Sequence, residues 1–158
     1  MRFGIKIKTP VGIFAVEERN GMISRVYLPN QVSDTTDTLE IIDEQSGILK
    51  NAEIQFTEYF GGRRKNFDLP LDFSGCTEFT VRVYQELMRV KYGETASYKD
   101  IAERVGSPKA YRAVGLANNK NPLPIIVPCH RIVGTDGSLV GYAGGLEMKR
   151  WLLDLESE

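Results

Sequence analysis

The sequence is poor in the residues that build several common kinds of site. Its 158 residues include one histidine, two cysteines and one tryptophan. Two cysteines exclude a disulfide framework, and Cys76, Cys129 and His130 are too few ligands for a structural zinc site. We therefore expect no metal centre, and no motif in the chain points to a cofactor. A free thiol also implies a reducing, intracellular setting.

The chain also lacks a long apolar run. No stretch approaches the roughly 20 residues that a membrane-spanning helix needs. The segment Met1–Lys6 has no apolar core of the kind found in secretory signal peptides. We therefore expect a cytoplasmic protein with no membrane contact, and we expect it to be a monomer.

An excess of charge of either sign is absent too, since 20 basic and 21 acidic residues leave a net charge of −1. One segment departs from this balance, since residues 104–135 contain basic side chains and no acidic one. A basic field within a neutral protein is typical of a DNA-binding surface, although an ordinary solvated face gives the same pattern. The basic residues are Arg104, Lys109, Arg112, Lys120 and Arg131.

Residues 1–74 have the pattern of a small α/β domain that supports the rest of the chain. Apolar residues alternate over the first thirty positions, and this alternation predicts three strands. Thr9–Gly12 and Asn20–Gly21 have the composition of the hairpin turns that would join them. The remaining segments predict a loop at Pro29–Thr38, one or two helices at Leu39–Phe60 and a strand at Asp68–Phe73.

Residues 75–158 read as a second, mainly helical domain. Ser97 is a good N-cap, with Asp100 at the capping-box position, and a second helix is expected at Lys109–Asn118 after a short turn containing Gly106. Two short helices joined in this way form a helix-turn-helix, in which the second helix reads DNA. Two apolar stripes predict a preceding and a final helix, namely Phe79, Val83, Leu87 and Val90, and Met148, Trp151, Leu152 and Leu155.

The stretch Pro128-Cys129-His130-Arg131 holds the only histidine beside one of the two cysteines. A thiol reacts as thiolate, and with a pKa near 8.5 only about 3% is ionised at pH 7. A neighbouring imidazole and nearby positive charge are the usual remedy. Adjacent side chains rarely point the same way, so His130 would act through a water or a turn. From these residues alone, a buried structural cysteine beside a surface histidine is an equal alternative.

Three further motifs surround this stretch in a fixed order and spacing. They are Tyr111-Arg112-Ala113-Val114-Gly115-Leu116-Ala117 with the following Asn118-Asn119-Lys120-Asn121-Pro122, then Gly141-Tyr142-Ala143-Gly144-Gly145-Leu146, and finally Lys149 with Trp151-Leu152-Leu153.

Together these motifs closely resemble the O6-alkylguanine-DNA alkyltransferases, the methylated-DNA–protein-cysteine methyltransferases. The resemblance is strong from about Gly93 to Glu156 and loose over the first seventy residues. It implies a ribonuclease-H-like α/β domain over residues 1–74 and a winged helix-turn-helix domain over residues 75–158. It further implies single-turnover repair, in which an alkyl group passes from O6-alkylguanine in double-stranded DNA, and in some members from O4-alkylthymine, to Cys129 after base flipping.

The resemblance also implies roles for the residues around the thiol. Cys129 resembles the alkyl acceptor, His130 its base acting through a water, and Glu156 the acid that orients the imidazole. Asn121 resembles the residue that ties together the turns around the cysteine. Tyr98 resembles the tyrosine that pushes the flanking phosphate and donates to the base.

Other residues resemble the DNA-binding and pocket residues of the family. Arg112 resembles the side chain that enters the base stack, with the small Ala113 and Gly115 allowing close approach to DNA, and Arg131 is expected to add a phosphate contact. Tyr111 departs from the small residue usual at its position, and Cys76 matches no family role. The expected pocket consists of Tyr142 as a wall, the Ala143 amide as a donor to O6, Gly144 in the same loop, and the Ile132 and Cys129 carbonyls as acceptors for the exocyclic amine.

Simpler interpretations exist for each of these residues and for the whole chain. Arg112 alone fits a phosphate contact, Tyr98 and Tyr142 fit core aromatics, and Glu156 fits a solvated charge. A non-catalytic alkylation-damage sensor would lack Cys129. A winged-helix regulator would not need the nucleophile, and a cysteine hydrolase would need a histidine far away in sequence.

Overall fold

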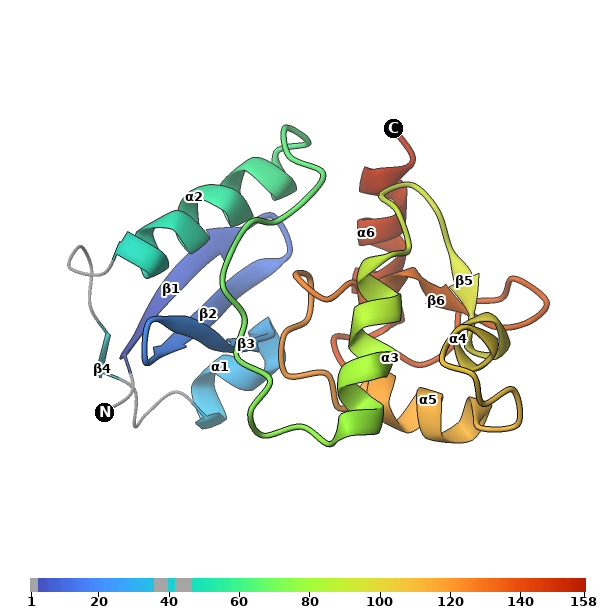
Figure 1. The fold of residues 1–158 in the computed structure, drawn as a ribbon. Helices are drawn as coiled ribbons and strands as arrows, with labels where there is room; N and C mark the ends of the chain where they lie inside the picture. Colours follow the sequence, from blue (N-terminus) through green and yellow to red (C-terminus); the bar gives the residue numbers. More distant parts are fainter. Residues whose placement is uncertain (1–2, 36–39, 42–46) are drawn as a thin grey trace. The chain divides into compact units, whose positions relative to one another are not determined.

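A computed structural model describes residues 3–35, 40–41 and 47–158 of the chain. The chain divides into two compact units, Met1–Ser74 and Gly75–Glu158, which are considered separately (Figure 1). The division lies where the composition changes from alternating apolar residues to helical stripes. Within the described residues, no helix is long and apolar enough to cross a bilayer.

The first unit contains a four-stranded sheet of order β3-β2-β1-β4. Strand β1 (Phe3–Thr9) is antiparallel to β2 (Gly12–Arg19), and β2 is antiparallel to β3 (Met22–Tyr27). The predicted three strands are therefore confirmed. The second hairpin turn has positive φ at both Asn20 (54°) and Gly21 (78°), as the twist of two-residue hairpins requires. The fourth strand, β4 (Glu40–Ile41), runs parallel to β1.

Helix α2 (Gly47–Phe60) covers the sheet with its apolar face (Figure 1). The Phe56 ring lies 6.0 Å from the Phe14 ring of β2, and both side chains are fully buried. The prediction of one or two helices over Leu39–Phe60 is thus confirmed from Gly47 to Phe60. The short strand β4 occupies part of the range, and residues 39 and 42–46 lie outside the described residues.

Two sequence expectations in this unit are wrong in part. Pro29–Thr35 forms helix α1 where a loop was predicted. Pro29 supplies the φ of a first helical residue, and the Gln31 side chain accepts from the Leu28 amide in the manner of a capping box. The predicted strand Asp68–Phe73 is reduced to one bridge between Leu71 and Ile23, because Pro70 has no amide hydrogen to donate.

The second unit is built from four α-helices, and the helices expected here are confirmed. Two short strands lie side by side in parallel, with Ala96 paired to Ile132 (Figure 1). This pairing places the start of the second helix beside the segment that follows Cys129. The elements are α3 (Glu78–Met88), β5 (Ala96–Ser97), α4 (Tyr98–Arg104), α5 (Tyr111–Asn119), the single turn η1 (Cys129–Arg131), β6 (Ile132–Val133) and α6 (Leu146–Glu156).

The core of this unit differs from expectation on one helix. The predicted stripe on and after α3 is buried at Val83, Leu87 and Val90, and half-buried at Phe79. Tyr84 adds a hydrogen bond of 2.9 Å from its hydroxyl to the Ala117 carbonyl of α5. On α6, however, the buried residues are Lys149, Leu152 and Glu156, so of the predicted stripe only Leu152 is buried, and Met148, Trp151 and Leu155 are half-buried. Two charged side chains therefore lie on the buried face of α6: Glu156, which was expected beside His130, and Lys149, whose burial was not expected.

Helix α4 begins at the predicted cap. The Ser97 hydroxyl accepts from the Asp100 amide at 3.0 Å, and the Asp100 carboxylate accepts from the Ser97 amide at 2.9 Å. Both partners satisfy amides that the first helical turn leaves without a carbonyl. This reciprocal pair fixes the chain direction at the point where β5 becomes α4.

Ser97→Ala should lower the free energy of unfolding by about 1 kcal/mol, because an amide at the start of α4 loses its acceptor. Urea denaturation followed by circular dichroism measures the difference. Ser97→Thr keeps the hydroxyl and should retain most of the stability. Equal losses in the two variants would mean that the hydroxyl is not acting as a cap.

Candidate functional site

Cys129 begins the single turn η1 and is 4% exposed. The apolar run before it includes Ile125, whose φ of 76° lies in the left-handed region that β-branched residues rarely adopt. Such a conformation costs roughly 1–3 kcal/mol and persists only where the surroundings enforce it. The backbone approaching the thiol is therefore held in place by its packing and hydrogen bonds.

Asn121 supplies two of those hydrogen bonds. Its Nδ2 donates to the Val127 carbonyl at 2.8 Å, and its Oδ1 accepts from the Leu123 amide at 2.9 Å. The Val127 amide in turn donates to the Leu123 carbonyl at 2.8 Å. The side chain thus ties together the turns that precede Cys129, which is the geometry expected for Asn121 from the sequence.

The thiol of Cys129 is protonated at rest. Burial raises the pKa of Cys129 to about 11, against the opposing effects of a hydrogen bond from the Asn121 side chain and the charge of Lys149. A thiol with this pKa is a poor nucleophile at neutral pH. Reaction at this site therefore requires that a neighbouring base take the proton when a substrate is bound.

His130 is fully buried, and its Nε2 lies 2.7 Å from Oε2 of Glu156. A carboxylate only accepts, so Nε2 carries the proton and Nδ1 is the basic nitrogen of the neutral ring. Burial lowers the pKa of His130, although the hydrogen bond and charge of Glu156 oppose the shift. For Glu156, burial alone would raise the pKa, but hydrogen bonds from His130 and Arg131 hold it at about 2.

Arg131 is not on the surface, and the expectation that it contacts DNA is not met by this geometry. Its Nε and Nη2 donate to the two carboxylate oxygens of Glu156 at 2.8 and 3.0 Å, and its Nη1 donates to the Val90 carbonyl at 2.8 Å. The guanidinium is buried together with the carboxylate. The charge that the sequence places beside the thiol is therefore neutralised within the fold.

Lys149 of α6 is a site residue to which the sequence analysis assigned no role. Its Nζ is buried and donates to the carbonyls of Ile132 and Val140, the latter at 2.8 Å. Burial lowers the pKa of Lys149 to about 8, and the proximity of Cys129 opposes that shift. The ammonium group thus links α6, the strand after Cys129 and the start of the Gly-rich loop.

Two aromatic residues border the thiol. Tyr98, the first residue of α4, lies against α5, since a Cβ placed on Gly115 would contact its ring at 3.7 Å. Burial, followed by the proximity of Cys129, raises the pKa of Tyr98. Tyr142 belongs to the Gly-rich loop, where burial followed by the proximity of Cys129 raises its pKa. Both phenols are therefore protonated at neutral pH.

A side chain at Gly144 would force its neighbours in and beside the Gly-rich loop to move. A Cβ there would come within 2.8 Å of the Tyr142 ring and 2.9 Å of the Met148 sulfur. Ala143 is exposed in the same loop, whereas Ile132 is buried beneath it and bonded to Lys149. The predicted pocket residues thus lie on one loop and the strand that Lys149 joins to it.

The basic residues that the sequence predicted are exposed on and around α5, apart from Arg131, and Arg112 is the one that lies within the helix. Arg112 and Ala113 are exposed near its start, while Gly115 is half-buried under Tyr98. Leu116, one turn after Arg112, is 57% exposed, and Tyr111 is 47% exposed. An apolar side chain on this face is a feature that the sequence pattern did not reveal. The other exposed basic residues of the run are Arg104, Lys109 and Lys120.

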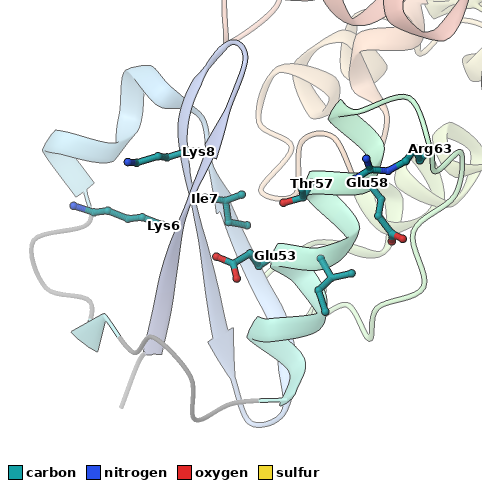
Figure 2. Close-up of a pocket in the computed structure, with 8 residues that line it drawn as sticks. Lys6, Ile7, Lys8, Glu53, Thr57, Glu58 and Arg63 are labelled. Atoms are coloured by element: carbon teal, nitrogen blue, oxygen red, sulfur yellow. The ribbon is translucent and has the colours of Figure 1, made fainter.

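A separate groove lies in the first unit, between β1 and α2 (Figure 2). Lysines from β1 and acidic residues from α2 line it. It contains none of the residues that the sequence singled out for chemistry. The labelled residues are Lys6, Ile7, Lys8, Glu53, Thr57, Glu58 and Arg63.

The sequence has many relatives of one kind. The profile of the 6-O-methylguanine DNA methyltransferase DNA-binding domain matches residues 78–158. The constitutive methylated-DNA–protein-cysteine methyltransferase of Bacillus subtilis is 44% identical over 161 residues, covering 99% of this chain and 96% of that protein. The methylated-DNA–protein-cysteine methyltransferase of Methanosarcina barkeri is 50% identical over 113 residues, covering 72% of this chain and 71% of that protein.

Solved structures give the same result. The crystal structure of Mycobacterium tuberculosis O6-methylguanine methyltransferase superposes with a TM-score of 0.86 at 37% identity, covering 99% of this chain and 93% of that one. A crystal structure of Mycobacterium tuberculosis OGT in complex with DNA gives a TM-score of 0.88 at 38% identity, covering 98% and 92%. The similarity therefore extends over both units.

The stability of the protein should fall as the pH drops below about 6.5, through His130. Burial lowers the pKa of folded His130 below its ordinary 6.5, so the unfolded chain binds that proton more strongly. His130 is the only histidine, so it dominates the window between about pH 5 and 7. Urea unfolding across this window should show the slope in the wild type and lose most of it in His130→Gln. An unchanged slope in the variant would contradict this origin.

Proposed function

This chain belongs to the methylated-DNA–protein-cysteine methyltransferase family, and on that premise we propose that it repairs DNA by moving an alkyl group from O6-alkylguanine to Cys129. The observation that carries the proposal is that the turn η1 holds a buried thiol next to His130, whose ring is hydrogen-bonded to Glu156 of α6. The same unit presents exposed basic residues on α5 and in the segments next to it. The protein would act once, because the thioether product has no route back to the thiol.

The proposed reaction is a direct displacement. The Cys129 thiol gives its proton to His130 through a water, and the sulfur attacks the alkyl carbon as the carbon–oxygen bond breaks. The electron pair of that bond remains on guanine, which gains a proton from Tyr98. The His130 imidazolium then returns its proton through solvent to the Tyr98 phenolate, so the proton lost by the thiol balances the one gained by guanine and no cofactor is needed. Glu156 keeps the proton of His130 on Nε2 and stabilises the imidazolium that forms.

The other pocket residues bind the extruded base. Tyr142 forms a wall of the pocket, and the Ala143 amide donates to O6. The carbonyls of Cys129 and Ile132 accept from the exocyclic amine. Lys149 supports this arrangement, because its bonds to Ile132 and Val140 fix the strand and the loop that carry these groups. Gly144 allows the Tyr142 ring to lie flat along the loop.

The DNA partner would lie along α5, the second helix of a winged helix-turn-helix, with the first unit serving as a ribonuclease-H-like support. Phosphate contacts from exposed basic residues would supply most of the affinity and little sequence preference. Arg112 would enter the base stack and offset part of the unstacking cost of a few kcal/mol. The protein would bind alkylated duplex as a monomer in the cytoplasm.

Incubation with a duplex containing O6-methylguanine should add one methyl group to the protein, on Cys129. Intact mass spectrometry followed by peptide mapping locates the adduct, and a duplex containing O4-methylthymine tests the second substrate. Cys76→Ser should react like the wild type, and Cys129→Ser should not react. An adduct on Cys76, or repeated turnover, would refute the proposal.

Arg112→Ala should slow transfer from duplex DNA by a factor of about 100 or more, because the base must leave the stack before the thiol can reach it. Transfer from free O6-benzylguanine, which needs no extrusion, should change little. Single-turnover rates with the two substrates measure the difference. The matched control Arg150→Ala removes an exposed charge from α6 and should leave both rates near wild type. Equal slowing with both substrates would assign Arg112 to the pocket or the fold.

A further inference from the structure

Leu116 is a large apolar side chain that lies in solvent on α5, and no role has been assigned to it so far. Its exposed fraction of 57% is the largest among the large apolar side chains of the described residues, and the next largest is 49% at Leu146. A single exposed leucine is ordinary in a folded protein, so its exposure alone indicates no function. What distinguishes Leu116 is the set of residues around it.

Leu116 lies at the centre of the exposed face of α5. Residues three and four positions apart are neighbours on the surface of a helix, and all four such neighbours of Leu116 are exposed. They are Arg112, Ala113, Asn119 and Lys120. The buried residues of α5 are Val114, Ala117 and Asn118, on the other side of the helix. Leu116 therefore does not lie at the margin of the core, where a partly exposed leucine would be explained by packing.

The charged neighbours of Leu116 are both positive. Arg112 lies one turn before it and Lys120 one turn after it, and residues 104–135 contain no acidic side chain. A second copy of the same face would bring like charges together, which opposes its docking here. The charge around Leu116 instead favours a partner that carries negative charge beside apolar surface.

Duplex DNA has both of these properties. Phosphates border each groove, and the sugars and base edges between them offer carbon atoms to an apolar side chain. On α5 the two cations lie about 6 Å along the helix axis on either side of Leu116, since four residues rise by that distance. Proteins that bind in a groove commonly combine basic side chains with apolar ones, which contact methyl groups or insert between base steps.

We infer that Leu116 is a DNA-binding residue, which packs against sugars and base edges in the groove that α5 enters. Its contact supplies a part of the duplex affinity that does not depend on salt, because burial of an apolar side chain releases no counterions. The inference rests on the proposed function and adds an apolar contact to the phosphate contacts already proposed. Leu116 takes no part in the transfer step itself.

The test is the affinity for an undamaged duplex of mixed sequence, measured by fluorescence anisotropy over a range of salt concentrations. Leu116→Ala should weaken binding about fivefold at every salt concentration and leave the slope of log affinity against log salt unchanged. Lys120→Ala should instead reduce that slope by about 0.9, the value for one phosphate contact. Leu116→Gln should behave like Leu116→Ala, and Leu116→Met should retain most of the affinity. Wild-type affinity in Leu116→Ala, or a loss of affinity that comes with a changed slope, would overturn the inference.

Met88→Ala is the matched control for the loss of an exposed apolar side chain. Met88 ends α3 and is 38% exposed, and its loss should leave duplex affinity near wild type. Leu116→Ala should transfer the alkyl group from free O6-benzylguanine at the wild-type rate, because this substrate needs no contact with DNA. A slower rate with the free base would assign Leu116 to the fold or the pocket and overturn the inference. If the wild-type protein gains no methyl group from alkylated duplex, the proposed function itself fails. If it does and Leu116→Ala binds duplex like the wild type, only the inference about Leu116 fails.

Discussion

The second unit depends on one buried carboxylate. Glu156, at the end of α6, receives hydrogen bonds from both His130 and Arg131, and Arg131 extends the link to the carbonyl of Val90 just after α3. A buried ion pair adds little net stability, but removing one partner costs about 3–5 kcal/mol because the other is left uncompensated. The pair therefore acts as a geometric constraint, since it fixes the imidazole, the turn η1 and two helices relative to one another.

Near this carboxylate, opposing electrostatic effects set the pKa of the Cys129 thiol. Burial disfavours the thiolate, while the Asn121 amide and the Lys149 ammonium favour it. Burial also lowers the pKa of Lys149, and the proximity of Cys129 opposes that shift. Each buried charge is thus tolerable only because of its neighbours, so the site consists of coupled groups and not of a single activated cysteine.

Local sequence features predicted most elements of the structure. The Ser97 cap, the Asn20–Gly21 turn and the α3 stripe depend on neighbouring residues alone, and the structure confirms them. Arg131, Lys149 and Asn118 could not be placed, because their burial depends on partners up to 41 residues away. A charge in a basic run is usually solvated, and nothing local shows that Glu156 meets Arg131. The spacing of Asn118 four residues after Val114 was the one available signal, since it places the amide on the buried face of α5.

The protonated state of Cys129 has a consequence for the lifetime of the protein. Oxidants attack thiolates, and susceptibility rises with thiolate character and exposure. With a pKa of about 11 and almost no exposed surface, this sulfur offers little of either to peroxide or to mixed-disulfide formation. A molecule that is consumed by its first reaction must keep its sulfur reduced while it waits. The burial that makes the resting thiol a weak nucleophile also protects it from oxidation until an extruded nucleobase enters the pocket.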